Sequence, residues 1–396
     1  MSVERVLPKT LDYTDVLPLA VESKSRRRTF FPNNGADFVS NGNNIIRIDL
    51  SADALLDTQH SYLRFQFDTQ SAAGAHAQTR GIDYAGGHSF IRRLRIEQSG
   101  TVLEDIQSYN RLMGAVVLPC QSTSEHKKTR TITEAICGDG ATVGARATAG
   151  FAPLAFTGST SGILGQVNNS ATQIPAAQRV TQFAIPLTSG LLNCDKLVPL
   201  MLMSAPLTIE IELANETQAC ITTGGAPLAY AIRDVRYVAN LVEVGQDVSQ
   251  QLRMLQEVSG GVLTLAGQTY RHFSGQYQGN ATNNVVNVPA RVKSMKSLFF
   301  ASQGAGNDAV GTYDVGTGGH MNLVSYQLKI GSVVYPPTAV SATAAGINTA
   351  GGAASNTCAE CLMELEKAWG NTGSRFGLSN ETGMSTFYSA ESVRST

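Results

Sequence analysis

The sequence has few charged side chains and no excess of either sign. Charged residues make up 15% of the 396 positions, with 30 basic and 31 acidic side chains, against about 25% in typical soluble domains. A protein that coats nucleic acid over its whole surface shows a basic excess, so any nucleic-acid contact should be local. The low charge together with 38 glycines predicts a β protein with many turns and a surface largely covered by neighbouring molecules.

The signatures of common catalytic sites are also missing. The sequence has no GxxxxGK[ST] phosphate loop, no HExxH and no GxSxG. Its six histidines never show the HxH spacing of a metal-dependent jelly-roll enzyme. Cys358 and Cys361 form a CxxC, but a zinc ribbon needs a second such pair. We therefore expect reduced thiols, no catalytic residue, no metal and no cofactor, and we do not expect an enzyme.

Long apolar runs are absent as well. No stretch of 18 or more apolar residues occurs, so the sequence predicts no transmembrane helix. The N-terminal residues MSVERVLPKTLDYTDVLPL lack the apolar core of a secretory signal peptide. We expect the protein to be made and assembled inside a cell and not to be secreted.

What the sequence does contain is a series of short alternating segments. Ile46, Ile48 and Leu50 alternate with Arg47 and Asp49, which is typical of a strand with one buried face. Similar strands are expected at 61–67, 93–97, 102–104, 180–185, 207–213, 230–244, 262–266, 285–288, 292–301, 323–330 and 333–335. Helices are expected at 109–118, where Ser108 would cap the first turn, at 247–258 and at 358–369.

The remaining segments predict an arm and two long loops. Residues 1–40 are polar and contain a basic cluster of Lys24, Arg26, Arg27 and Arg28, and we interpret them as an irregular arm. The cluster could contact phosphates in a sequence-independent way, pair with acidic groups of a neighbouring molecule, or simply be solvated. Residues 137–178 and 337–357 are rich in Gly, Ala, Ser and Thr and predict surface loops that make contacts.

The two halves of the chain resemble each other. Asn43-Asn44 before a strand recurs as Asn283-Asn284, and the hairpin that begins at His88 recurs at His320. A helix follows each hairpin, and the repeat interval is roughly 240 residues. Many short strands, long loops and one helix in each copy favour two tandem jelly rolls. The expected organisation is an arm (1–40), a first jelly roll (41–246), a helical connector (247–260) and a second jelly roll (261–396).

The second copy is expected to be incomplete. The first copy continues well beyond its helix before it closes at about residue 244, whereas few residues follow the second helix. On this comparison the second jelly roll lacks its last three or four strands. Another chain would then complete the sheet, because unpaired strand edges promote association, or the sequence is truncated.

Four blocks resemble a known family. They are RRRTFFPNNG from Arg26, NNIIRIDL from Asn43, FIRRLRIEQSGTVLEDIQSYNRL from Phe90, and FAIPLTSGLLNCDKLVPLMLMSAPLTIEIEL from Phe183. They resemble the double-jelly-roll major capsid proteins of the adenovirus and tailless-phage lineage, most closely those of polinton-like viruses and virophages. The resemblance covers roughly residues 25–335 and is stronger in the first half.

This resemblance implies a structural role in a virion. It implies a homotrimer that forms a pseudo-hexagonal capsomer and tiles an icosahedral capsid around double-stranded DNA. Its partners would be neighbouring capsomers and penton or minor capsid proteins, with non-specific contact to genome DNA or an internal membrane. The alternative is a carbohydrate-binding β-sandwich of a viral spike or lectin, and the few aromatic residues in the long loops count against it.

Overall fold

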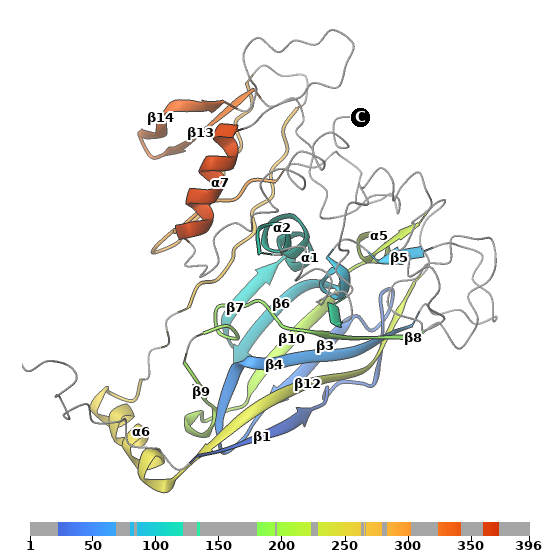
Figure 1. The fold of residues 1–396 in the computed structure, drawn as a ribbon, viewed down its shortest axis with the longest axis vertical. Coiled ribbons are helices and arrows are strands. Elements are labelled where there is room, and N and C mark those ends of the chain that lie inside the picture. Colours follow the sequence, from blue (N-terminus) through green and yellow to red (C-terminus); the bar gives the residue numbers. More distant parts are fainter. Residues whose placement is uncertain are drawn as a thin grey trace, which may run out of the picture.

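The computed structural model describes residues 23–68, 80–82, 85–121, 133–134, 180–194, 196–222, 229–262, 265, 267–278, 283–301, 324–341 and 359–371. The described part is mostly antiparallel β-sheet with short helices, which confirms the all-β class. Figure 1 shows two sheets packed face to face, with helix α6 beyond one end of them and a hairpin with helix α7 near the other. No helix in the described ranges is long and apolar enough to cross a membrane.

Eight strands build a sandwich from residues 23–244. One sheet has the order β1-β12-β4-β8 and the other β3-β10-β6-β7. Their bounds are β1 Ser23–Phe30, β3 Ile45–Leu50, β4 Leu55–Asp68, β6 Ile91–Gln98, β7 Thr101–Gln107, β8 Val180–Ile185, β10 Leu207–Leu213 and β12 Ala231–Val244. Short strands β2 (Asp37–Val39) and β9 (Val198–Pro199) extend the first sheet, and β5 (Arg80–Ile82) pairs with β11 (Cys220–Thr222).

The pairing of these strands is nested. The first of the eight pairs with the last (β1 with β12), the second with the seventh (β3 with β10), and the third with the sixth (β4 with β8). The fourth and fifth strands, β6 and β7, form the central hairpin. An antiparallel hairpin of eight strands rolled into two facing sheets is a jelly roll. The strand order of the described residues therefore confirms the first jelly roll.

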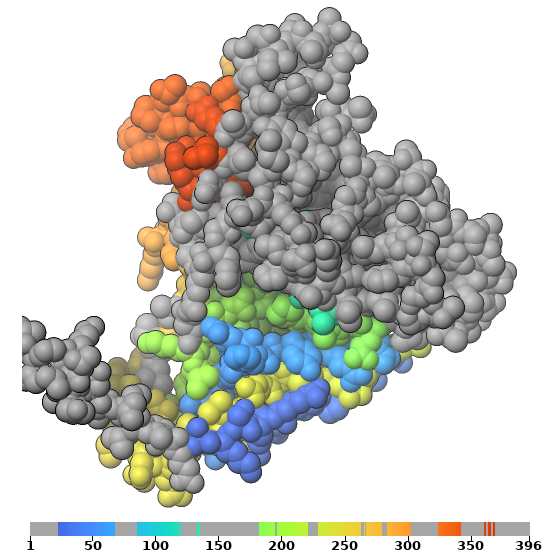
Figure 2. All heavy atoms as spheres, in the orientation of Figure 1, coloured from blue at the N-terminus to red at the C-terminus, as the bar shows by residue number. Residues whose placement is uncertain are grey.

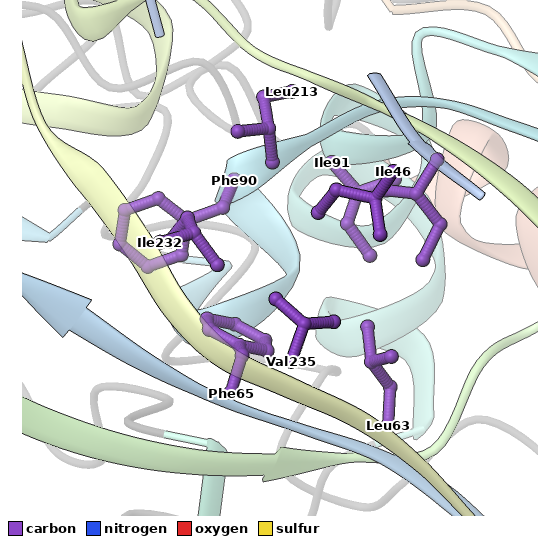
Figure 3. A pocket seen from close by; sticks show the side chains of 9 residues that line it. Ile46, Leu63, Phe65, Phe90, Ile91, Leu213, Ile232 and Val235 are labelled. Carbon is purple, nitrogen blue, oxygen red and sulfur yellow. The ribbon is translucent and has the colours of Figure 1, made fainter. Parts of the chain in front are cut away.

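The alternating residues fill the space between the sheets. Ile46, Ile48 and Leu50 are buried, as are Leu63, Phe65 and Phe67, as their alternation predicts. Figure 3 looks into a small cavity between the sheets, where the side chains of Phe65, Phe90 and Ile232 point toward one another. Phe90 lies 5.9 Å from Phe65 and 5.7 Å from Phe183 between ring centroids, in the range of favourable aromatic pairs.

The predicted turn and the first helix are present with two differences. Ser99 and Gly100 both have positive φ (49° and 79°), as a two-residue hairpin turn requires. The helix runs through α1 (Tyr109–Arg111), a π-helical turn (Leu112–Val117) and α2 (Leu118–Gln121), so it continues past the predicted end. Ser108 does not cap it: this residue is left-handed (φ 52°) and its side chain makes no cap hydrogen bond.

The expectation of an irregular arm is wrong for residues 23–30. These residues form β1, which pairs with β12 along its whole length, from Ser23 opposite Val244 to Phe30 opposite Tyr237. The segment shows no alternation because Phe30 is its only large apolar side chain and is buried at the inner end. Backbone pairing with β12 therefore determines this strand, and the first jelly roll begins before residue 41. Residues 1–22 lie outside the described ranges.

The second half confirms some elements and corrects others. The connector helix α6 spans Gln246–Val258, hairpin strands β13 and β14 span Ser325–Ile330 and Val333–Ser341, and helix α7 spans Ala359–Asn371. Strands expected at 285–288 and 292–301 are not strands. Segments rich in β-prone residues become strands only when an adjacent strand supplies backbone partners, and no strand pairs with them in the described part. Residues 337–341 belong to β14 and not to a loop.

The packing of the sandwich predicts that substitutions at two neighbouring positions of β10 lower the free energy of unfolding by different amounts. Ile209 is fully buried between Ile48 and Ile96, and we expect Ile209→Ala to lower the free energy of unfolding by about 2–5 kcal/mol. Thr208→Ala on the outer face removes one hydrogen bond to Asp49 and should cost about 0.5–1.5 kcal/mol. Urea unfolding followed by circular dichroism measures both; equal losses would contradict the strand's orientation.

Candidate functional site

The space between the sheets does not have the character of a ligand site. The cavity of Figure 3 is lined by nine residues, all aliphatic or aromatic, contributed by both sheets. Ligand sites usually combine apolar walls with a few convergent polar groups that orient the ligand, and this lining has none. Within the described ranges, no group of three or more His, Cys, Asp or Glu is placed to hold a metal ion. The interior serves packing.

The buried pair of His88 and Glu134 has a structural role. His88 Nε2 lies 3.0 Å from Glu134 Oε2, and His88 Nδ1 lies 3.3 Å from the hydroxyl of Tyr109. That hydroxyl accepts a hydrogen bond from the backbone N–H of Thr188 at 2.9 Å. His88 and Tyr109 are fully buried and Glu134 is nearly so, which prevents direct contact with a substrate. The chain of hydrogen bonds ties four separate segments together, those of His88, Tyr109, Glu134 and Thr188.

Glu104 holds a second buried polar centre. Its carboxylate accepts hydrogen bonds from Ser189 Oγ at 2.5 Å, from Gly190 N at 2.8 Å and from Leu191 N at 3.3 Å. Ser189 Oγ in turn accepts the N–H groups of Leu191 and Leu192, each at 3.2 Å. Successive backbone N–H groups facing a carboxylate form an anion-binding turn, and here the anion belongs to the protein itself. This contact fixes the loop after β8.

The loop after β8, which Glu104 fixes, contacts the segment that follows the connector helix. A Cβ added to Gly190 would lie 2.5 Å from the carbonyl oxygen of Gln268, so the two backbones cross at a distance that only glycine allows. Tyr270 packs against the core of the first jelly roll, and burial raises the pKa of its hydroxyl. His272 Nδ1 lies 3.4 Å from Ser108 Oγ, and burial lowers the pKa of this histidine. We call this contact, between residues 265–272 and the first jelly roll, the seam.

Helix α7 also contacts the first jelly roll, in addition to the seam. Leu365 of α7 and Phe299 pack against the core of the first jelly roll, as do Leu112 and Val116 of the first helix. The Ser297 hydroxyl donates a hydrogen bond to the carbonyl oxygen of Ala368 at 2.6 Å. The second half is therefore anchored to the first by apolar contacts and not only by the connector. Figure 1 shows α7 beside the extended chain that leads up from α6.

The basic residues predicted for the arm lie on the edge strand β1. By the register, Lys24, Arg26 and Arg28 lie opposite Glu243, Leu241 and Ala239, which places these three on the inward face of the sheet. Arg27 lies opposite Asn240 on the outward face. Arg26 Nε forms an ion pair with Glu243 at 2.7 Å, and Arg28 stacks on the Phe30 ring at 4.9 Å. Lys24 and Arg27 have no ion pair in the described part.

Charges on the other sheet are arranged differently. The carboxylate of Glu210 on β10 forms an ion pair with Arg47 Nε at 2.8 Å and a second one with Arg95 Nη1 at 3.6 Å. Arg93 donates two parallel hydrogen bonds to Asp105, both 2.7 Å long. The Arg93 hydrogen bond lowers the pKa of Asp105, so this contact stabilises the fold above the ordinary aspartate pKa and is lost as pH falls through the lowered value. The outer face of this sheet is thus internally neutralised.

A third feature is apolar surface in the second half. Large apolar side chains are exposed on the extended segment and on the hairpin, including Val285 (93%), Phe300 (64%) and Tyr335 (50%). Hairpin residues Ile330 and Val333 are also exposed, at 49% each. Single exposed apolar residues are common, but here they recur along the extended segment 283–301 and along the β13–β14 hairpin, and each is a position that another molecule can cover. We call these residues the open apolar face.

The sequence located some of these features and missed others. The motif around Ser189 and Gly190 was recognised by its sequence, but its partner Glu104 was not, because no local signal links residues 85 positions apart. The long loop 137–178 lies outside the described residues, so its role as a contact loop stays a prediction. The same holds for Cys358 and for residues 342–357.

The seam predicts that Gly190 cannot carry a side chain. We expect Gly190→Ala to displace residues 267–268, which should lower the thermal unfolding temperature and increase hydrogen exchange in segment 262–275. Gly42→Ala is the matched control, because a Cβ there meets only the Val39 side chain at 4.0 Å. Equal behaviour of both variants would show that the seam does not form in solution.

The buried thiols predict a pattern of alkylation. Burial raises the pKa of Cys120 to about 12, so at pH 8 this thiol is protonated and inaccessible, and the thiolate is the reactive form. We expect iodoacetamide to leave Cys120 unmodified in the native protein and to modify it after denaturation, with peptide mass spectrometry as the readout. Cys361, which is partly exposed, should react sooner; the reverse order would contradict the packing of the first helix.

No family model matches the chain, and no curated protein matches it. Among solved structures, the chain is similar to the Faustovirus major capsid protein (10% identity, 62% of this chain and 58% of that chain, TM-score 0.37).

It is also similar to the Sputnik virophage structure determined by cryo-EM (10% identity, 62% and 53% coverage, TM-score 0.36) and to the quasi-atomic model of the PBCV-1 virus capsid (11%, 60% and 46%, TM-score 0.36). The chain thus spans about half the length of these structures. These likenesses are too distant to decide a function, and the jelly-roll assignment rests on the strand order.

Proposed function

We propose that the protein is a major capsid protein, a structural subunit of a virus shell. The observation that carries the proposal is the open apolar face, which the chain exposes although the described part of the first jelly roll has a buried apolar core of its own. A chain that leaves Val285, Phe300 and Tyr335 in solvent is stabilised by covering them with other subunits.

The finer proposal is a trimer of two-jelly-roll subunits. Three subunits with two units each form a closed ring with six similar positions, and closed cyclic symmetry is the common arrangement of soluble oligomers. In this proposal the second unit, residues 261–396, follows the connector α6 and is held to the first by the seam. The ring would tile an icosahedral capsid around double-stranded DNA, next to penton and minor capsid proteins, in virions assembled inside the host cell.

The oligomeric state tests this proposal. We expect the full chain to sediment in analytical ultracentrifugation at about three times its mass of 42.0 kDa, and to form shell fragments when expressed with its partner capsid proteins. A stable monomer that does not assemble, or binding of the monomer to a glycan array, would contradict the capsid proposal and favour the carbohydrate-binding alternative.

A substitution on the open apolar face should separate assembly from folding. We expect Phe300→Asp to weaken each contact between subunits roughly 10- to 150-fold, the equivalent of about 1.5–3 kcal/mol for a large apolar side chain, and to shift the trimer toward monomer. Ser99→Asp adds the same charge at the exposed turn between β6 and β7 in the first jelly roll, far from Phe300 in the sequence, and should leave the trimer intact. Circular dichroism confirms that both variants fold.

A further inference from the structure

Within the described residues, the edge strand β1 has one row of backbone groups that pairs with no other strand. It ends the order of its sheet, so only one of its two edges pairs with a described strand, and it is eight residues long. Figure 2 shows its dark blue atoms at the lower rim of the molecule, next to the yellow atoms of β12. Residues Ser23 to Arg28 are exposed. An exposed edge of this length is a template for the addition of another strand.

The charges on β1 exclude one partner. A second copy of β1 placed beside the first, in either direction, would set the cationic stretch of residues 24–28 against itself. Like charges directly opposite each other destabilise a strand pair. The strand is therefore protected against pairing with itself, although its backbone is open. A partner strand with carboxylates opposite these cations would instead be attracted to β1.

The distribution of the cations over both faces favours a strand over a nucleic acid. Lys24, Arg26 and Arg28 lie on the inward face and Arg27 on the outward face. A rigid duplex laid against the sheet meets the cations of one face only. The side chains of an added strand alternate between the same two faces, so carboxylates on it can meet both sets. Other described edges carry no comparable cluster: β7 contains Glu104 and Asp105, and β8 contains no charged residue.

We propose that β1 binds an extended acidic segment of another protein by strand addition. Backbone hydrogen bonds along the free edge supply the affinity, and carboxylates opposite Lys24, Arg27 and Arg28 supply the specificity. Arg26 already forms an ion pair with Glu243 and therefore contributes less to the recognition of the acidic segment. The inference rests on β1 alone and goes beyond the shell proposal, since a chain that fails to form trimers can still bind such a segment at this edge.

The full chain and a synthetic peptide test the inference. The probe is the fluorescein-labelled peptide Thr-Val-Glu-Glu-Glu-Thr-Glu-Thr, which places glutamates opposite the four cations in an antiparallel pair. We expect saturable binding by fluorescence anisotropy, and increased protection of segment 23–30 from hydrogen exchange. The glutamine version of the peptide should bind more weakly. Absence of binding, or protection elsewhere in the chain, would overturn the proposal.

Two N-methylated peptides distinguish strand addition from simple charge attraction. Methylation of alternate amides blocks hydrogen bonds on one edge of the peptide and leaves its charge unchanged. We expect one methylation pattern to abolish binding and the complementary pattern to preserve it, because only one edge of an added strand faces β1. Equal affinities for both patterns would overturn strand addition. Tighter binding of a short DNA duplex that displaces the peptide would identify the edge as a phosphate site instead.

Matched variants locate the contact. Lys24→Gln and Arg27→Gln each remove a cation that has no ion pair in the described part, and each should weaken peptide binding roughly 1.4- to 5-fold, the range for one cross-strand charge pair. Arg92→Gln on the other sheet, where the side chain is 54% exposed, should leave the affinity unchanged. A similar loss for Arg92→Gln would show that the peptide senses overall charge and would overturn the assignment to β1.

Discussion

The pairing of β12 with both β1 and β4 is the contact on which the rest of the first unit depends. β12 lies between a strand that begins at Ser23 and a strand that begins at Leu55, and it joins them only after the chain has reached residue 231. The same nesting recurs for β10 between β3 and β6. Neither sheet can close until its last strand arrives, which gives long-range contacts a dominant role and predicts slow folding. The buried core and the fixed loops follow from this closure.

The closed sandwich uses its polar groups in two ways. Buried groups such as Glu104 and His88 hold loops in place, and the outer face of the β3-β10-β6-β7 sheet pairs its charges internally, as Glu210 does with Arg47. Two features stand apart from this pattern. In the described part, Lys24 and Arg27 of the edge strand β1 form no ion pair, and large side chains of the second half such as Val285 and Phe300 are exposed to solvent. We interpret both as surfaces for other molecules, one polar and local, the other apolar and extended.

Alternation made most of the first jelly roll predictable from sequence. LTIEIEL becomes β10 and the Ser99-Gly100 turn joins β6 to β7 because these signals are local. β1 was missed because SKSRRRTF carries no alternation and is a strand only through its pairing with β12. Segments 285–288 and 292–301 show the opposite error, since β-prone residues do not form strands where no neighbouring strand is present in the described part. The Glu104 contact with Gly190 was beyond prediction because it depends on the completed fold.

A cryo-EM reconstruction of the purified full-length protein, alone or assembled, tests the central claim most directly. The account predicts three chains in a closed ring, with the first jelly roll as residues 23–244 resolve it and with the open apolar face buried between chains. It would be contradicted by a monomer, or by an oligomer in which Phe300 and the β13–β14 hairpin face solvent while another surface makes the contacts between chains.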